Sequence, residues 1–296
     1  MARLWPVLGA GAGILAVVAS CNASSLVPAA QSSATPVPVT TQTPRPLPPL
    51  PPSRAIGIVS LEGEFTQGGW ARGQLARGEV ASGAGALALD GTPVQVSPDG
   101  RFFVAFDRDA GAAARLSVKL LDGRTIDKPL SISPRAWRIE RIPLGPKPGT
   151  PPDPAWLKRR EGETAQINAA RSVDHPSDGW RQKFIWPVKG RISGQFGAQR
   201  VYPAGPAAYH SGIDIATGTS GTPFIAPADG VVILAAQTSF SLEGRLLMID
   251  HGMGLNSAFL HCSSLDVKVG DVVRQGQQIG RIGLACCFLS PGQADC

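Results

Sequence analysis

His210 and Asp214 are the residues whose types and spacing most directly predict chemistry. They stand four positions apart in the segment HSGID, with Gly212 between them. Imidazole nitrogen and carboxylate oxygen are both good zinc ligands, and a glycine permits the tight backbone that would aim both side chains at one ion. Alone the spacing is a weak signal, because a turn histidine beside a solvated aspartate has the same pattern. The surrounding sequence therefore decides between a metal site and an ordinary turn.

Several short segments after this pair favour the metal site. In order they are Gly221-Thr222-Pro223, Ala226-Pro227-Ala228-Asp229-Gly230-Val231-Val232, Ile249-Asp250-His251-Gly252, Phe259-Leu260-His261 and Val269-Gly270-Asp271-Val272-Val273. In this order the segments resemble the lysostaphin-type (LytM-like) zinc metalloendopeptidases, which cut the peptide cross-links of peptidoglycan. The resemblance covers roughly residues 184 to 283 and depends on several independent motifs.

The resemblance implies an antiparallel β-sheet groove with zinc at its floor, and it assigns roles to three residues. His210 and Asp214 correspond to the first two zinc ligands, and His261 to the histidine that helps to move a proton of the metal-bound water. Zinc polarises the scissile carbonyl and lowers the pKa of that water, while a neutral imidazole is suited to accept the proton. A buried core histidine is the alternative for His261. His251 resembles a structural turn residue of the family, not a ligand.

The family pattern stops at Gly283. Family members close the site with a His-x-His strand, in which the second histidine is the third zinc ligand and the first is another catalytic residue. Here no histidine follows His261, and residues 284–296 read LACCFLSPGQADC, with three of the five cysteines. Such an abrupt change indicates a shifted reading frame, and natural truncation is the alternative. In a third hypothesis Cys286 or Cys287 replaces the missing ligand, but the turn that would aim a thiolate is gone.

The incomplete ligand set leads to two hypotheses about function. Catalytic zinc sites normally use three protein ligands and leave one position for water, so we expect an incomplete zinc site and an inactive or barely active chain. The first hypothesis is a zinc metalloendopeptidase that hydrolyses peptidoglycan cross-link peptides. The alternative is a non-catalytic peptidoglycan-binding protein or an activator of a wall amidase, as some metal-less family members are. The presence of His210, Asp214 and His261 favours the first.

The elements that would position these residues are predicted to be mostly β-strands. The sequence contains 35 glycines and 27 prolines, and only 17% of its residues are charged, which favours strands and turns over a helical bundle. Apolar runs at residues 230–234, 246–250 and 258–261 indicate buried strands. They belong to the predicted peptidase domain, residues 184–296, an antiparallel sheet that lacks its last strands. The missing strand is expected to leave one sheet edge unpaired.

A small β-sandwich-like module is predicted at residues 56–146. Asp-Gly turn pairs punctuate it at residues 90–91, 99–100 and 122–123, and Phe102, Val104 and Phe106 alternate as the buried face of a strand would. Its carboxylates have no histidine near them in the sequence, so we find no chemistry in this module. A spacer or a recognition module are both consistent with the pattern.

A linker with a short helix is predicted at residues 147–183. Asp153 and Pro154 provide an N-cap and a first-turn proline, and residues 155–171 contain several helix formers. Trp156, Arg160 and Glu163 would lie along one side of this helix. His175, in the turn that ends it, is expected to be polar surface.

Residues 1–21 are predicted to be a lipoprotein signal peptide. Arg3 precedes an apolar run over residues 5–18, which is too short to span a bilayer. The ending Val18-Ala19-Ser20-Cys21 resembles the bacterial lipobox, in which Cys21 becomes the acylated first residue; plain secretion with cleavage near Ala23 is the alternative. The Pro-rich linker that follows, residues 22–55, would be a semi-rigid spacer.

These features place the chain in the envelope of a Gram-negative bacterium. Acyl chains on Cys21 would anchor it to a membrane face in the periplasm without spanning the bilayer. Asn22 at the next position favours the outer membrane, by resemblance to Gram-negative sorting. The net charge of +6 suits an anionic wall polymer such as peptidoglycan, although it also serves simple solubility. No interleaving of basic and aromatic residues indicates nucleic acid as a partner.

Overall fold

The computed structural model describes residues 54–80, 85–143, 153–203, 205–206, 208–283 and 286–289. The predicted signal peptide with Cys21, and the Pro-rich linker except for its last two residues, lie outside the described residues. No helix in the described ranges is long and apolar enough to cross a membrane. All described residues belong to one unit, which extends from Pro49 to Cys296.

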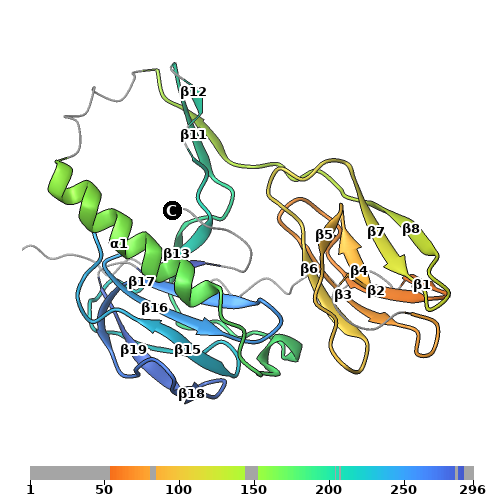
Figure 1. The fold of residues 1–296 in the computed structure, drawn as a ribbon. Helices are drawn as coiled ribbons and strands as arrows, with labels where there is room; N and C mark the ends of the chain where they lie inside the picture. Colours follow the sequence, from red (N-terminus) through yellow and green to blue (C-terminus); the bar gives the residue numbers. More distant parts are fainter. Residues whose placement is uncertain are drawn as a thin grey trace, which may run out of the picture. The chain divides into compact units, whose positions relative to one another are not determined.

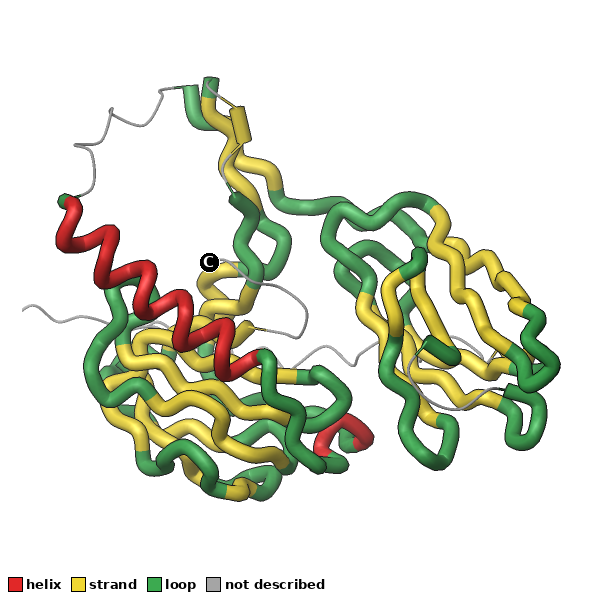
Figure 2. The backbone as a smooth tube through the Cα atoms, in the orientation of Figure 1, coloured by secondary structure: helices red, strands yellow, loops and turns green. Residues whose placement is uncertain are grey.

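Strands make up most of the regular structure, which confirms the prediction of a mostly β protein (Figures 1 and 2). The helical elements of the described part are α1 (Pro154–Arg171) and a 3₁₀ turn, η1 (Gly179–Arg181). Nearly every strand pair is antiparallel; the parallel pair joins β9 (Ile139–Arg141) to β11 (Gln199–Tyr202), which also pairs with β12 (Gly205–Pro206). Apart from this three-stranded sheet, the strands fall into an N-terminal module and a C-terminal module.

The N-terminal module consists of two four-stranded antiparallel sheets. The first has the order β1 (Arg54–Ile56), β2 (Val59–Gly63), β3 (Trp70–Leu75), β6 (Arg101–Ala105), and the second has the order β5 (Thr92–Pro93), β4 (Leu87–Leu89), β7 (Ala113–Lys119), β8 (Thr125–Ser131). One core joins the two sheets, because Phe102 and Leu61 of the first pack in the same cluster as Leu87 and Leu116 of the second. The predicted alternation is present, since Phe102, Val104 and Phe106 are all buried.

The helix α1 begins where its sequence signals predict. Asp153 caps it, because its carboxylate accepts a hydrogen bond from the Ala155 amide at 3.1 Å. The helix buries Glu163 and Ile167. Ile167 packs in a cluster with residues of the C-terminal sheet, so α1 is more than a connection between modules. The sheet residues of that cluster are Ile233, Ala236, Leu246, Met248, Ala258 and Leu260.

The C-terminal module is one nine-stranded antiparallel sheet. Its main path runs through β10 (Arg191–Gly194), β13 (Gly212–Ala216), β20 (Cys286–Leu289), β17 (Asn256–Leu265), β16 (Arg245–Asp250), β15 (Gly230–Ala235) and β18 (Val272–Val273), and β14 (Pro223–Ile225) and β19 (Gln278–Ile282) complete it beside β17. Phe224, Phe259, Leu247 and Ile279 form the centre of its core. In Figure 1, α1 lies across the face formed by β15, β16 and β17.

The tail after Gly283 changes one expectation about this sheet. The absence of the family's closing strand was expected to leave a sheet edge unpaired. Instead β20 lies between β13 and β17 and pairs with both, which places Cys287 opposite Asp214 and Phe288 opposite Phe259. The expectation is therefore wrong at this position. A short apolar segment of different sequence satisfies the same backbone groups, because strand pairing depends on the main chain.

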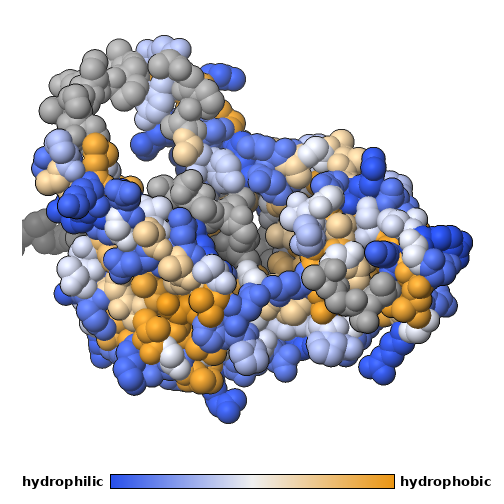
Figure 3. All heavy atoms as spheres, in the orientation of Figure 1, coloured by the Kyte–Doolittle hydropathy of each residue, from blue (hydrophilic) through white to orange (hydrophobic). Residues whose placement is uncertain are grey.

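Apolar residues reach the surface at one end of the sheet. Figure 3 shows hydrophobic residues gathered over the region that Figure 1 labels β15 and β18. Val269, before β18, and Val272, within it, are 59% and 71% exposed. β18 has only two residues and pairs with β15. Such a short strand offers few backbone groups to another chain, which limits association between sheet edges.

Candidate metal centre

His210 and Asp214 are in direct contact. His210 precedes β13 and Asp214 lies within it, and His210 Nε2 is 3.3 Å from Asp214 Oδ1. Two ligand atoms bound to one tetrahedral zinc ion at about 2.0–2.1 Å are themselves about 3.3–3.4 Å apart. The two atoms therefore fit two corners of a zinc site.

The loop between β10 and β11 fixes the orientation of the His210 ring. His210 Nδ1 is 3.1 Å from the carbonyl oxygen of Gln195, which selects the tautomer with hydrogen on Nδ1 and the lone pair on Nε2, the arrangement usual for metal-binding histidines. The His210 backbone is held as well, because its amide donates to the Ala198 carbonyl and its own carbonyl accepts from the Gly197 amide, both at 2.8 Å.

Gly194 is a further part of this arrangement that the sequence analysis missed. It pairs with Asp214 where a bulge interrupts the register of β10 and β13. A Cβ atom at Gly194 would lie 2.1 Å from Asp214 Oδ2 and 3.0 Å from His210 Cε1. Only glycine leaves room for the two side chains at this point. The Ser-Gly pair that ends β10 was the available signal, since a glycine inside a strand often marks a bulge or a close approach.

His261 lies in β17 with a left-handed backbone conformation, φ +58°. The register of β16 and β17 shifts here, so the strand bulges and re-aims the side chain. The His261 amide donates to the Glu243 carbonyl at 2.8 Å, and its carbonyl accepts from the Gly283 amide at 3.0 Å. The side chain is exposed, so the alternative of a buried core histidine is wrong.

The three predicted residues line a single cavity of about 720 Å³. Its polar lining also includes Gln195, Gln199, Tyr209 and Glu243, with Arg138, Glu140, Arg200 and Tyr202 around them. In the described residues, no group of three or more histidine, cysteine, aspartate or glutamate side chains is close enough to hold a metal ion. The structure thus brings together two matched ligands and one candidate proton carrier, and a third ligand is not found in the described part.

His251 has a structural environment. Its ring is buried, with Nδ1 2.7 Å from the Asp229 carbonyl oxygen and Nε2 2.7 Å from Ser257 Oγ. Burial lowers the pKa of this imidazole below its ordinary value. A neutral ring that uses both nitrogens inside the fold fits the turn residue that the resemblance implies.

His175 differs from its expectation as polar surface. It is half-buried, its amide donates to Asp250 Oδ2 at 2.8 Å, and its Nδ1 lies 3.4 Å from the same oxygen. Asp250 also accepts from the Gly252 amide at 2.8 Å. This buried carboxylate therefore ties the segment after α1 to the turn that follows β16.

A buried arginine also supports the loop that holds His210. Arg108, in the turn after β6, is 6% exposed and donates to the Gly197 carbonyl through Nε and Nη2 at 3.3 and 3.1 Å. Its guanidinium lies 5.3 Å from the Trp137 ring and 5.1 Å from the Tyr209 ring, so it makes cation–π contacts with both. Tyr209 precedes His210 directly. The sequence analysis found no chemistry in the N-terminal module and missed this contact.

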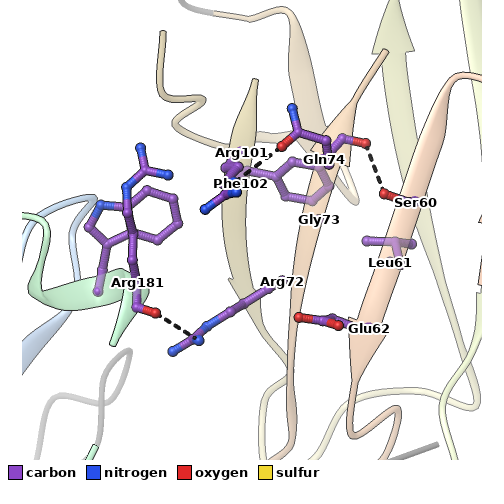
Figure 4. Close-up of a pocket in the computed structure, with 10 residues that line it drawn as sticks. Ser60, Leu61, Glu62, Arg72, Gly73, Gln74, Arg101, Phe102 and Arg181 are labelled. Carbon is purple, nitrogen blue, oxygen red and sulfur yellow. Dashed lines mark hydrogen bonds between the residues drawn. The ribbon is translucent and has the colours of Figure 1, made fainter. Parts of the chain in front are cut away.

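A second cavity, of about 370 Å³, lies against β2, β3 and β6 (Figure 4). Its charged groups are largely engaged with one another or with the main chain. Arg181 forms a fork with Asp99 at 2.9 and 3.0 Å, which holds the pKa of that carboxyl well below its usual range. Arg72 donates to the carbonyls of Arg181 and Gln182 at 3.2 and 2.7 Å. The candidate chemistry is therefore at the His210 cavity.

Comparison with known proteins identifies the domain that carries this cavity. Residues 208–287 match the model of peptidase family M23. A crystal structure described as a putative peptidase M23 from Pseudomonas aeruginosa superposes with a TM-score of 0.55 at 26% identity, over 77% of this chain and 90% of that one. The chain thus contains a peptidase M23 domain of the lysostaphin (LytM-like) type, with the fold of that family.

Curated relatives match the same region. Cell division protein DipM of Caulobacter vibrioides is 34% identical over 101 residues, which is 34% of this chain and 15% of that protein. The peptidoglycan DD-endopeptidase ShyA of Vibrio cholerae is 35% identical over 103 residues, 34% of this chain and 23% of that protein. The murein hydrolase activator NlpD of Escherichia coli is 33% identical over 108 residues, 36% of this chain and 25% of that protein. The matched region spans about a quarter or less of each of these three relatives.

Proposed function

We propose that the His210 cavity is a zinc site of the kind that hydrolyses peptide cross-links in peptidoglycan. One observation carries this proposal: His210 Nε2 and Asp214 Oδ1 approach to 3.3 Å in a cavity that His261 also lines. A relative described as a peptidoglycan DD-endopeptidase supports the substrate class.

His210, Asp214 and His261 have different parts in this proposal. His210 and Asp214 would hold the metal ion, with the Gln195 carbonyl keeping the His210 ring in the required tautomer. When bound, zinc supplies polarisation of the scissile carbonyl and a more acidic water. The exposed imidazole of His261, in the same cavity, would accept a proton from the attacking water and return it to the leaving amine.

Metal binding by single-residue variants tests this assignment. His210→Ala and Asp214→Ala should each weaken zinc binding by more than the roughly 10–100-fold typical of an outer-shell change, whereas His261→Ala should bind zinc as the unaltered chain does. His175→Ala is the matched control, because His175 is not among the cavity residues. If calorimetry gives the same zinc affinity for the unaltered chain and all four variants, the site is excluded.

The number of ligands sets the expected activity. A catalytic zinc site normally uses three protein ligands, and the 296-residue sequence has no histidine after His261. We expect the purified chain to hold far less than one zinc ion per molecule and to release no fragments from cross-linked murein. Near-stoichiometric zinc that Cys287→Ser removes would instead show that the tail supplies a ligand. Reading the coding DNA beyond codon 283 in the other frames, for a His-x-His strand, tests the frameshift hypothesis directly.

A non-catalytic role is the second candidate. It is favoured by the incomplete ligand set and by the similarity to a protein described as a murein hydrolase activator. In this role the chain would bind peptidoglycan or stimulate a separate wall amidase. Stimulation of a purified wall amidase by both the unaltered chain and Asp214→Ala would favour the activator, because activation would then be independent of the metal ligand.

We also propose that the chain is a lipoprotein of the Gram-negative periplasm, anchored through Cys21 and directed to the outer membrane. The sequence Val18-Ala19-Ser20-Cys21 after an apolar run supports this. Cys21→Ser should release the protein from the membrane fraction, because the acylated residue would be gone. Unchanged fractionation would refute the anchor.

A further inference from the structure

The helix α1, which the sequence analysis assigned to a linker, makes an ionic contact with the wall of the candidate metal centre. Arg160 donates two hydrogen bonds to Glu243, from Nη1 to Oε2 at 2.6 Å and from Nη2 to Oε1 at 2.7 Å. The two side chains are only 21% and 12% exposed. A bidentate pair with little solvent access fixes geometry more strictly than an exposed pair does. Glu243 lines the cavity that contains His261.

Glu163, a carboxylate of α1, holds the other end of the turn at residues 240–244, to which Glu243 belongs. Glu163, which is buried, accepts hydrogen bonds from the backbone amide and the hydroxyl of Ser241, both at 2.9 Å. Phe240 and Gly244 close the turn by pairing their backbones, at 2.8 and 3.2 Å. Residues 240–244 are therefore fastened to α1 at two points.

The fastened turn holds the backbone of His261. The Glu243 carbonyl accepts the His261 amide at 2.8 Å, and a Cβ atom at Gly244 would lie 3.3 Å from His261 Cα. His261 adopts φ +58° within the bulge of β17. A non-glycine residue keeps this left-handed backbone conformation only where the surrounding structure holds it there. The turn supplies part of that restraint from the side of α1.

We propose that Arg160 and Glu243 are a positioning pair for His261. Through this pair, α1 helps to hold the His261 backbone in place. This inference rests on the proposed function, in which His261 moves the proton. Neither residue needs to touch the reacting atoms, because the ion pair acts through the turn and the Glu243 carbonyl. Without it, the His261 backbone should leave the left-handed conformation part of the time and carry its ring away from the metal position.

Amide hydrogen exchange of the full-length chain tests the restraint. Glu243→Gln keeps the size of the side chain and Arg160→Gln shortens it, and each substitution removes the charge of one partner. We expect the His261 amide to exchange about tenfold faster in both, while amides in the centre of β16 keep their rates, because local opening is independent of the global fold. Lys158→Gln is the matched control, since Lys158 is exposed on the same helix.

A second readout follows the ring itself. With cobalt(II) as the probe ion, the pseudocontact shift of the His261 ring protons reports their distance and direction from the metal. We expect this shift to fall in Glu243→Gln, while the cobalt affinity, which depends on His210 and Asp214, stays within about twofold of the unaltered chain. A mere loss of stability would not move the ring at constant affinity.

The two proposals fail in different ways. If the unaltered chain binds neither cobalt nor zinc even with the ion in excess, the proposed function fails, and the exchange rates still decide the positioning claim. If His261 exchanges at the same rate in Arg160→Gln, Glu243→Gln and Lys158→Gln, the positioning pair is refuted even where metal binds. Faster exchange everywhere in the β16 centre would also refute it, because the pair would then support the whole sheet and not His261.

Discussion

At the scale of single residues, the candidate site depends on space as much as on ligands. His210 and Asp214 can share an ion only because Gly194 leaves the volume between them open. The same reasoning applies to His251, whose buried ring fills both of its hydrogen-bonding positions inside the fold. Each of these residues supports a prediction that separates its role from general stability.

Replacing Gly194 by alanine should damage metal binding. The added Cβ would lie 2.1 Å from Asp214 Oδ2 and 3.0 Å from His210 Cε1, so the two side chains could not keep their present positions. We expect zinc affinity, measured by calorimetry, to fall by about tenfold or more, since even outer-shell changes cost about 10–100-fold. Gly162→Ala is the control: it lies within α1 with open space around it and should stabilise the helix by about 1 kcal/mol. Unchanged affinity in Gly194→Ala would contradict the close packing.

The stability of the fold should depend on pH through His251. Burial lowers the pKa of this group in the folded chain, so the unfolded chain, with an ordinary histidine pKa of about 6.5, binds the proton first. The contribution is therefore fully present above that pH and is lost as the pH falls below it, by at most about 1.4 kcal/mol per pH unit. Urea unfolding between pH 7 and pH 5 should show a shallower decline for His251→Asn. Equal declines would mean that other groups carry the pH dependence.

At the scale of elements, α1 is joined to the sheet by both apolar and ionic contacts. Ile167 packs among residues of β15, β16 and β17, while Arg160 and Glu163 face the turn at residues 240–244. This helix therefore contributes to the core of the C-terminal module, although its position between the two modules predicted a linker.

Shortening Ile167 to alanine should destabilise the C-terminal module. The side chain is 7% exposed in a shared cluster, and removing a buried isoleucine in this way typically costs about 2–5 kcal/mol. Leu157→Ala on the same helix is the control, since Leu157 is 50% exposed and should change the free energy of unfolding by about 0.5 kcal/mol or less. Similar values for both variants in urea titrations would show that α1 does not belong to the core.

A further prediction concerns the loop at residues 195–199. Arg108 donates to the Gly197 carbonyl from a buried position between two aromatic rings. Arg108→Ala should lower the free energy of unfolding by about 1.5–3 kcal/mol, the range for hydrogen bonds to charged groups, and should raise amide exchange in the loop. Arg124→Ala, an exposed arginine of the same module, is the control. Loop protection that stays the same in Arg108→Ala would remove the link between the module and His210.

At the scale of the whole molecule, the sequence predicted the parts with local signals and missed those that depend on distant contacts. The mostly β fold, the alternation at Phe102, Val104 and Phe106, and the start of α1 at Asp153 all have signals within a few residues. The M23 domain was recognisable because its motifs stand in order along the chain. By contrast, Gly194 matters only through a strand partner twenty positions away. Arg108 contacts a loop 89 residues further along the chain and Glu243 pairs with a helix residue 83 positions before it, and no local pattern marks either residue.

The pairing of the tail with β13 and β17 also had no local signal in the sequence. The motifs recognised in the sequence end at Gly283, and the absence of the closing motif predicted a missing strand. Pairing between strands uses backbone groups that every residue carries, so the segment at residues 286–289 occupies the place between β13 and β17 in spite of its different side chains. Ligand identity, in contrast, depends entirely on side chains. The tail can therefore pair as a strand even though it contains no histidine.

The amide of Gly283 has a practical consequence for exchanging the tail of the chain. Gly283 holds the His261 carbonyl at 3.0 Å, and a Cβ atom there would lie 2.5 Å from that oxygen. Gly283, the last residue of the motifs recognised in the sequence, is thus also one of the two backbone anchors of His261. A graft that joins a donor tail after Gly283 would keep both anchors. A graft joined even one residue earlier would exchange an anchor together with the tail.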